Sequence, residues 1–327
     1  MKKLEEREMR KLNKPIFIML VGLPGSGKST YAKKLMDKEN LNFVVHSSDS
    51  IRKELSGDES NQDINKLVFE TLHNRVVEDL ENRRNVIYDA TNISSKRRRA
   101  FVNTYLNKVD CFKRCTIIAT PYEICYLQNL KRDRVVPNRV LVDMYKKFET
   151  PYYNEGWDEI NIHYEKEEYK SIYGHFSNFP ADTITFDQMN SHHTATLGKH
   201  CLLCKEYVFE NQYRIPFCYR EVEIAATIHD CGKPFTQAFR NAKGEPTKDA
   251  HYYGHNSVGA YNSLFYDMEK EVDRLYVSAL ICWHMLMHFF KNWKDKTKKK
   301  YEDMFLQCDK DFWHNLKILN EGDVYGH

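Results

Sequence analysis

A glycine-rich loop near the beginning of the chain constrains the fold more than any other feature. Residues 22–29 read GLPGSGKS, and they lie between an apolar, β-branched run at 16–21 and a stretch with helical spacing. Glycines in such a loop let successive backbone N–H groups turn toward a phosphate, and the N-terminus of the next helix adds partial positive charge. The pattern is a complete P-loop in the strand–loop–helix context that the motif requires. It predicts an α/β domain that binds ATP or GTP.

The residues of this loop have separate expected roles. Lys28 should bridge the outer phosphates, and Ser29 should ligate Mg²⁺. The expected nucleotide-binding residues are Gly22, Gly25, Ser26, Gly27, Lys28, Ser29 and Thr30.

The rest of the first half alternates strand-like and helical segments. Further buried strands are expected at 43–46, 85–88, 114–119 and 160–163, with a helix at 65–82. This alternation predicts a parallel sheet with crossover helices. Thr120, followed by Pro121 and Glu123, predicts a capping box that opens a further helix.

Two residues after the second strand are candidates for the acceptor side of a phosphoryl transfer. Asp49 and Arg52 follow this strand at its carboxyl end, where doubly wound folds place ligands. A carboxylate there can accept the proton of an attacking hydroxyl, and an arginine can hold an acceptor phosphate. The alternative is that Asp49 caps a helix and Arg52 is solvated.

Later polar residues extend this candidate site. Asp89 ends the third strand and is expected to orient either the acceptor or Mg²⁺, while the basic run at 96–99 is expected to be a solvated helix face or to attract a polyanion. A loop at 131–134 reads KRDR, and such a loop can place a guanidinium on the transferring phosphoryl group. Arg132 and Arg134 are the candidates in this loop, and Lys131 and Arg139 compete for the role.

These motifs together resemble the kinase domain of 5′-hydroxyl polynucleotide kinases over residues 14–164. The resemblance rests on the P-loop, DSIR at 49–52, DATN at 89–92, the arginine-bearing loop before Val-Pro, Pro151, and EGWDEI at 155–160. Beside Lys28 of the P-loop, which is expected to be catalytic, the resemblance implies that Asp49 is the general base, that Arg52 binds the acceptor phosphate, and that Asp89 lies near the acceptor nucleotide. It also implies that Arg132 and Arg134 are lid arginines.

The second half has a different pattern, because strand-like runs stop and histidine becomes frequent. Of 14 histidines, eleven lie after residue 170. Helical stretches near 197–210, 218–229, 255–266, 271–287 and 301–319 predict an all-α domain, in which Cys201 and Cys204 are core thiols. The expected organisation is a P-loop domain at 1–165, a linker at 166–184 and a helical domain at 185–327.

The helical half carries histidines and aspartates that could converge on a catalytic divalent metal. The expected ligands are His200, His229, Asp230, His255, His284 and Asp309. The spacing of His200, His229-Asp230 and Asp309 resembles the HD phosphohydrolase superfamily, in which His255 and His284 would bind a second metal or phosphate. This resemblance implies a metal-dependent phosphoesterase with one or two transition metal ions such as Mn²⁺. His192 and His193 could hold substrate phosphate, whereas His288 and His314 are expected to be incidental.

Composition excludes several classes of protein. Lys and Arg number 49 against 46 Asp and Glu, a balance too even for nucleic-acid binding by bulk charge alone. No apolar run approaches the ~20 residues that cross a bilayer, and the first ten residues lack the apolar segment of a secretory signal. The expectation is a cytoplasmic protein with reduced cysteines and no membrane association.

A 5′-kinase joined to an HD phosphoesterase resembles bacterial and phage RNA end-healing enzymes. The resemblance implies RNA or DNA ends as substrates, ATP and Mg²⁺ at the kinase site, and functional partnership with a nucleic-acid ligase. Two alternatives stay open: a nucleoside or metabolite kinase fused to an HD nucleotidase, and a nucleotide-gated binding module whose HD half is degenerate.

Overall fold

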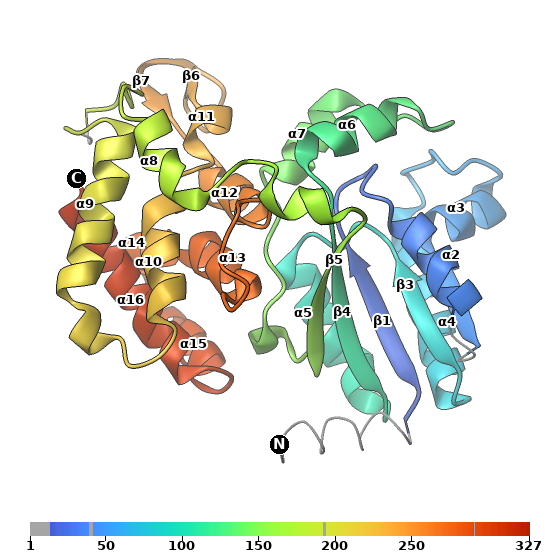
Figure 1. The fold of residues 1–327 in the computed structure, drawn as a ribbon. Coiled ribbons are helices and arrows are strands. Elements are labelled where there is room, and N and C mark those ends of the chain that lie inside the picture. Colours follow the sequence, from blue (N-terminus) through green and yellow to red (C-terminus); the bar gives the residue numbers. More distant parts are fainter. Residues whose placement is uncertain (1–13, 39–41, 192–193, 291) are drawn as a thin grey trace. The chain divides into compact units, whose positions relative to one another are not determined.

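The computed structural model describes residues 14–38, 42–191, 194–290 and 292–327 (Figure 1). His192 and His193, the candidate phosphate contacts, lie outside this set. The chain divides into two compact units. The first contains the residues up to Leu141 together with Glu155–Glu165, and the second contains Val142–Asn154 and Lys166–His327. Residues 142–154, expected within the P-loop domain, are therefore grouped with the second unit.

The first unit is built on a five-stranded parallel sheet, which confirms the predicted sheet type. The strand order is β2-β3-β1-β4-β5. Apolar side chains fill both faces of the central strand, whose residues 17–21 are almost completely buried, as is typical of strands covered by helices on both sides. The strands are β1 (Ile16–Val21), β2 (Phe43–Ser47), β3 (Asn85–Asp89), β4 (Phe112–Ala119) and β5 (Glu159–Tyr164).

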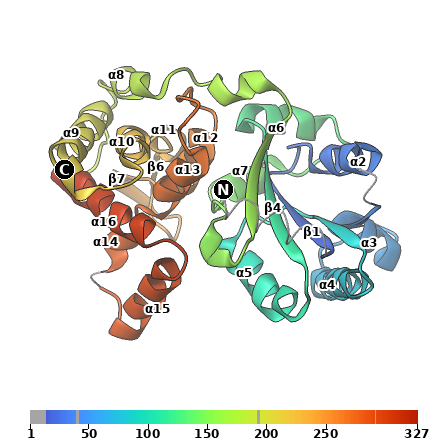
Figure 2. The same ribbon diagram turned by 60° about the horizontal axis from the view of Figure 1, so that its bottom comes forward.

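Helices cover both faces of this sheet. On one face, Ala32 of α2 packs against Ile18 and Ile87, and on the other Phe101 of α5 contacts Phe17 of β1. Figure 2 shows α2 and α5 on opposite sides of the strands. The helices are α2 (Lys28–Lys38), α3 (Ser48–Ser56), α4 (Asn65–Glu81), α5 (Ser95–Thr104), α6 (Tyr122–Leu130) and α7 (Asn138–Tyr145), with 3₁₀ turns at Leu106–Lys108 and Tyr153–Glu155.

The start of α6 differs from the expected capping box in the position of the proline. Pro121 occupies the N-cap position, whereas the pattern places it at the first helical position, and its own side chain makes no capping hydrogen bond. The hydroxyl of Thr120 instead donates to the carbonyl of Ser26 at 3.0 Å, so it ties the end of β4 to the P-loop. The sequence pattern does not predict this tertiary hydrogen bond.

A buried ion pair lies behind the basic run at 96–99. Arg98 donates from Nε and Nη2 to the two carboxylate oxygens of Glu155, each at 2.7 Å, and both side chains are excluded from solvent. Arg98 also donates to the carbonyl of Asn92, and Trp157 Nε1 donates to Glu155 at 2.8 Å. Arg98 is therefore a structural residue, while Lys96 is exposed.

The second unit is mostly helical, but the all-α expectation is wrong. An antiparallel pair, β6 (Ala238–Arg240) with β7 (Pro246–His251), lies between two of its helices. The expected helix at 301–319 is also two helices, separated at residues 307–309. The helices are α8 (Phe179–Asp182), α9 (Leu197–Glu210), α10 (Tyr219–Ile228), α11 (Lys233–Thr236), α12 (His255–Ser263), α13 (Arg274–Trp283), α14 (Leu286–Phe290), α15 (Asp295–Leu306) and α16 (Lys310–Tyr325).

The segment expected as a linker is folded into this unit. It contains 3₁₀ turns at Glu167–Ser171 and Phe176–Asn178, followed by α8, and its aromatic residues Tyr169, Phe176 and Phe179 are buried. A third 3₁₀ turn lies at Gln212–Arg214. Cys201 and Cys204 are fully buried free thiols on α9, as the sequence predicts. Within the described ranges, no helix has both the length and the apolar character to cross a membrane.

The buried ion pair yields a stability prediction. Arg98→Ala leaves Glu155 buried without its cation, a change that costs about 3–5 kcal/mol. Hydrogen exchange of the β1 and β3 amides should therefore show a lower opening free energy by that amount. Lys96→Ala, on the exposed side of the same helix, should change it by less than about 0.5 kcal/mol. Equal effects of the two substitutions would contradict a structural role for Arg98.

Candidate functional site

The P-loop of the first unit has the backbone that phosphate binding requires. Gly25 and Gly27 have φ values of 80° and 91°, in the left-handed region that favours glycine. A Cβ at Gly25 would also lie 2.2 Å from the carbonyl oxygen of Cys125 in α6, so this position cannot accept a side chain. The loop leads directly into the N-terminus of α2, which begins at Lys28.

Lys28 and Ser29 lie where nucleotide and Mg²⁺ would bind. The Lys28 ammonium donates to the carbonyls of Gly22 and Leu23 at 3.0 and 2.8 Å, and its burial lowers its pKa against the attraction of Asp89. Ser29 Oγ donates to Asp89 Oδ2 at 2.6 Å. A P-loop serine beside a strand-end aspartate is the pair that holds Mg²⁺ in P-loop enzymes. The contact favours the Mg²⁺ role that the sequence left open for Asp89.

Asp49 and Arg52 do not follow the alternative of a capping residue and a solvated arginine. Ser47 is the N-cap of α3, and Arg52 is buried. Arg52 Nη1 donates to Asp49 Oδ1 at 2.8 Å, and its Nη2 donates to Asn65 Oδ1 at 2.8 Å. The Nε of Arg52 is buried and has no hydrogen-bond partner among the described residues. A buried donor of this kind is suited to an anionic ligand.

The arginine-bearing loop reaches the same carboxylate. Arg134 Nη1 donates to Asp49 Oδ1 at 2.9 Å, and Arg132 Nη2 lies 3.9 Å from Asp49 Oδ2. Asn129, which sequence reasoning missed, anchors this loop: its side chain donates to the carbonyl of Val136 and accepts from the N–H of that residue. Arg139 is exposed on α7. The site therefore gathers Asp49 and the guanidinium groups that could bind a transferring phosphate.

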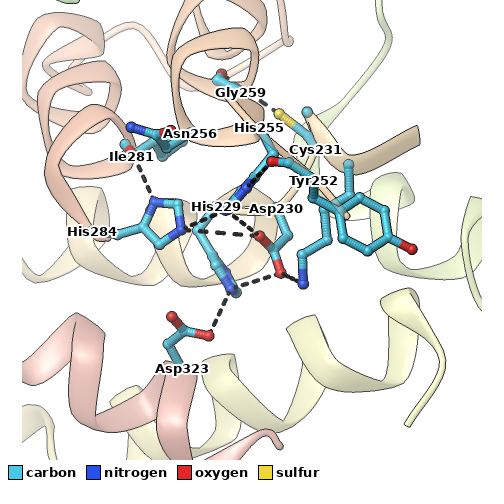
Figure 3. Close-up of polar contacts among 12 residues, drawn as sticks. His229, Asp230, Cys231, Tyr252, His255, Asn256, Gly259, Ile281, His284 and Asp323 are labelled. Carbon is cyan, nitrogen blue, oxygen red and sulfur yellow. Dashed lines mark hydrogen bonds and ion pairs between the residues drawn. The ribbon is translucent and has the colours of Figure 1, made fainter. Parts of the chain in front are cut away.

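The second unit brings its histidines and aspartates into one buried cluster (Figure 3). One ligand atom from each of four buried residues lies within 4.8 Å of the others, and Asp230, His255 and His284 form a second such group. The two groups share Asp230, whose Oδ2 lies 3.3 Å from His200 Nε2 and whose Oδ1 lies 3.4 Å from His255 Nε2. The members of the first group are His200, His229, Asp230 and Asp323.

Backbone carbonyls orient three of the imidazole rings. Nδ1 of His229 donates to the carbonyl of Ala226 at 3.0 Å, and His255 and His284 make the same bond to the residues three positions before them. This arrangement directs each Nε2 toward the cluster, and Nε2 of His255 and His284 lie 3.2 Å apart. Metal-binding histidines are commonly held in this way.

The histidines of the cluster differ in pKa. Burial alone would lower the pKa of His229, but the carboxylates of Asp230 and Asp323 outweigh burial and raise it to about 10. Burial lowers the pKa of His284 to about 3 and lowers that of His255. Lys233 and the nearby histidines hold the pKa of Asp230 well below its usual range, despite burial. The carboxylates are thus ionised and the second histidine pair is neutral.

The expected ligand Asp309 does not lie in the cluster. It is the N-cap of α16, accepts the N–H of Phe312, and accepts a hydrogen bond from the hydroxyl of Tyr152. Asp323 of α16 takes its place, with Oδ1 3.1 Å from His200 Nε2. Helical spacing puts Asp323 on the same face as the buried residues Phe312, Leu316 and Leu319. A carboxylate on an apolar helix face is the signal that could have identified it.

Sequence reasoning also missed two neighbours of the cluster. Lys233 lies 2.7 Å from Asp230 Oδ2 and donates to Gln188 Oε1 at 2.6 Å, although it is almost completely buried. His288, expected to be incidental, has its Nε2 2.7 Å from Asp323 Oδ2. The motif His-Asp-Cys-Gly-Lys at 229–233 could have indicated Lys233, because it lies three positions after Asp230, the spacing of side chains one turn apart.

The donor set of the cluster fits a divalent transition metal. Imidazole nitrogens with carboxylate oxygens are ligands that such ions accept, and the bidentate position of Asp230 could serve one ion or two. A divalent ion held there would polarise a phosphoester and lower the pKa of water.

Comparisons with known proteins bear on the first unit. The sequence model of the AAA domain family matches residues 17–151. The chain is 30% identical over 150 residues to the L-seryl-tRNA(Sec) kinase of Methanococcus maripaludis, which covers 45% of this chain and 58% of that protein. The chain therefore spans less than two thirds of this curated relative. These matches support the prediction of a P-loop kinase domain.

Solved structures show further similarity. The chain is similar to a chain of the Pnkp1/Rnl/Hen1 RNA repair complex, with 28% identity, a TM-score of 0.37, and coverage of 40% of this chain and 43% of that chain. It is also similar to a gluconokinase from Sinorhizobium meliloti 1021, with 17% identity, a TM-score of 0.33, and coverage of 46% and 82%.

Asp309, the N-cap of α16, and Asp323 within this helix give a test of the cluster. Asp323→Ala should weaken Mn²⁺ binding by more than about 100-fold, because even partners outside the ligand set are worth about 10–100-fold. Asp309→Ala should keep wild-type Mn²⁺ affinity and lose about 1 kcal/mol of stability with the helix cap. Calorimetric Mn²⁺ titration and denaturation of the two variants measure both effects. If Asp309→Ala lost Mn²⁺ binding and Asp323→Ala kept it, Asp309 would be the ligand, as expected from sequence, and the assignment of Asp323 would be wrong.

Proposed function

We propose that the protein heals nucleic-acid ends with two activities: ATP-dependent phosphorylation of a 5′-hydroxyl end, and metal-dependent hydrolysis of a 2′,3′-cyclic phosphate or 3′-phosphate end. The observation that carries the kinase activity is the convergence of Arg52 and Arg134 on Asp49, at the carboxyl edge of the sheet that bears the P-loop. This arrangement supports hydroxyl activation beside a phosphate-binding site.

In the proposed kinase reaction, Asp49 accepts the proton of the 5′-hydroxyl. Its Oδ1 accepts hydrogen bonds from the two arginines, which leaves Oδ2 for the acceptor, and its side chain is 40% exposed and so can be reached. The O5′–phosphorus bond forms as the bond from the γ-phosphorus to the ADP oxygen breaks. Lys28, Arg132 and Arg134 stabilise the negative charge on the phosphoryl oxygens. Mg²⁺ held by Ser29 and Asp89 would offset charge on the ATP phosphates.

Two observations favour a polynucleotide as the acceptor. The unpartnered Nε of Arg52 offers a buried donor to an acceptor phosphate, which a bare nucleoside lacks. The curated relative is, by its name, a kinase of L-seryl-tRNA(Sec), a substrate that contains an RNA. A small-molecule kinase joined to a nucleotidase is the alternative.

For the helical unit we propose an HD-type phosphoesterase. His200, the pair His229-Asp230 and Asp323 would hold the first divalent ion, and His255 and His284, with Asp230, would hold a second. Lys233 lies against Asp230 at the same site and carries a positive charge suited to the substrate phosphate. Hydrolysis of a cyclic phosphate first leaves a phosphomonoester, and a second hydrolysis releases inorganic phosphate and leaves a 3′-hydroxyl. This end and a 5′-phosphate are the ends that a nucleic-acid ligase joins, and a ligase is the proposed functional partner.

The general-base assignment gives a kinetic prediction. Asp49→Ala should lower kcat for 5′-phosphorylation of an oligonucleotide by about 10²–10⁴-fold, because general base catalysis contributes an effect of that size. ATP affinity, measured by equilibrium titration, should change little. Asp110→Ala, which removes an exposed carboxylate paired with Lys14, is the matched control and should retain wild-type kinetics. A wild-type rate in Asp49→Ala would exclude this role.

The two activities should separate by substitution. Lys28→Ala should abolish 5′-phosphorylation and keep hydrolysis of 3′-phosphate or 2′,3′-cyclic phosphate ends, because Lys28 belongs to the P-loop unit. Asp230→Ala should do the converse, with loss of Mn²⁺ binding. The assay supplies ATP, Mg²⁺ and Mn²⁺ with oligonucleotides of defined ends and analyses both ends. Persistent hydrolysis of every tested end in Asp230→Ala would refute the second activity.

A further inference from the structure

A pocket of about 540 Å³ opens between α4, α5 and the sheet of the first unit. This volume lies within the range of about 300–1,000 Å³ that small-molecule sites occupy. Its lining includes five aromatic side chains: Phe69 and His73 of α4, Tyr88 of β3, Phe101 of α5, and Tyr105 at the end of α5. Neither the P-loop nor the arginine-bearing loop contributes to this wall, so the pocket is separate from the residues expected to bind ATP.

The aromatic wall is organised around His73. Its ring centroid lies 4.7 Å from that of Phe101 and 4.8 Å from that of Tyr105, and its Nε2 is 3.1 Å from the hydroxyl of Tyr88. Burial lowers the pKa of His73 to about 4, so the imidazole is neutral at physiological pH. A neutral aromatic wall favours a flat, uncharged ring system over an ionised group.

The pocket adjoins the proposed acceptor site at two points. Asn65 lines it and accepts a hydrogen bond from Arg52, which in turn donates to Asp49. Thr91 and Asn92, two and three positions after Asp89, also line it. One side of the pocket is therefore linked to the proposed general base, Asp49, through two hydrogen-bonded side chains, those of Asn65 and Arg52.

Positive charge lies at the exposed part of the lining. Lys66 and Arg97 are exposed and line the pocket, as does Glu70, which lies 3.9 Å from Lys66. The opposite charges of Lys66 and Glu70 largely cancel. The charge of Arg97 remains, so this part of the lining has a net positive charge that suits a phosphodiester. An apolar interior with a cationic exterior matches a nucleotide whose base is inserted and whose phosphate stays outside.

We infer that this pocket binds the base of the acceptor's 5′-terminal nucleotide, an inference that rests on the proposed polynucleotide kinase activity. The base stacks on the rings of Phe69, His73 and Tyr105, and its ribose carries the 5′-hydroxyl toward Asp49. Stacking tolerates all four bases, because each has a π-face. The pocket thus selects an acceptor that has a base, and it does not select a sequence.

Tyr105→Ala, tested on two oligonucleotides, measures this role. The substrates differ only at the 5′-terminal nucleotide, which is either normal or abasic. Tyr105→Ala should raise KM for the normal substrate by about tenfold or more, as loss of a stacking partner does, with little change in kcat. The wild type should show a similar rise with the abasic substrate, and Tyr105→Ala should add nothing to it.

Two control variants accompany this test. Tyr105→Phe keeps the ring and should behave as the wild type. Tyr213→Ala removes a tyrosine of the second unit that is 80% exposed and should also leave both KM values unchanged. An equal rise in KM for normal and abasic substrates in Tyr105→Ala would overturn the base-binding role, because the loss would not depend on the base.

Direct binding separates this inference from the kinase proposal. Uridine 3′-monophosphate is titrated into the full chain with ADP and Mg²⁺ present in excess to fill the P-loop site. Weaker binding by Tyr105→Ala than by Tyr105→Phe supports the pocket even if no oligonucleotide is phosphorylated, a result that would refute the kinase proposal alone. Equal binding by both variants would overturn the pocket assignment.

Discussion

The parallel pairing of β1 with β3 is the constraint on which the first site depends. Its register sets Leu20 opposite Asp89, and the N–H of Gly22 then donates to the carbonyl of Thr91 at 3.1 Å. The P-loop and the segment after β3 therefore leave the sheet side by side, which brings Ser29 to Asp89. A shift of one residue would turn Asp89 to the other face of the sheet. The segment that this pairing positions continues into the wall of the aromatic pocket.

Local sequence patterns predicted those features, such as strands and helices, that depend on residues close together in the chain. β-branched runs located the five strands of the parallel sheet, and helical spacing located α9 within its observed bounds. The positions of Asp49 and Arg52 followed from a general property of parallel sheets, whose strand ends meet at one edge. What the sequence did not predict is that Arg52 is buried against Asn65, because that contact joins α3 to α4.

Contacts between distant segments account for the errors. The basic run at 96–99 was expected to be a solvated helix face or to attract a polyanion, but in the fold Arg98 pairs with Glu155, 57 residues later. Asp309 looked like a ligand because it is an aspartate at a suitable distance from the histidines along the chain. The N–H groups at the start of α16 and the Tyr152 hydroxyl use its carboxylate instead. Asp323 enters the cluster through the packing of α16 against α9, which a linear spacing cannot express.

Charge balance explains how the cluster of the second unit can be buried. Asp230 and Asp323 bring two negative charges into the interior, which would be unfavourable unless cations offset them. Lys233 supplies one positive charge, and the carboxylates hold a proton on His229, whose pKa they raise to about 10. A divalent cation that displaces this proton would add one positive charge to the cluster. Because a phosphate end is an anion, this added charge would favour the proposed substrate at this site.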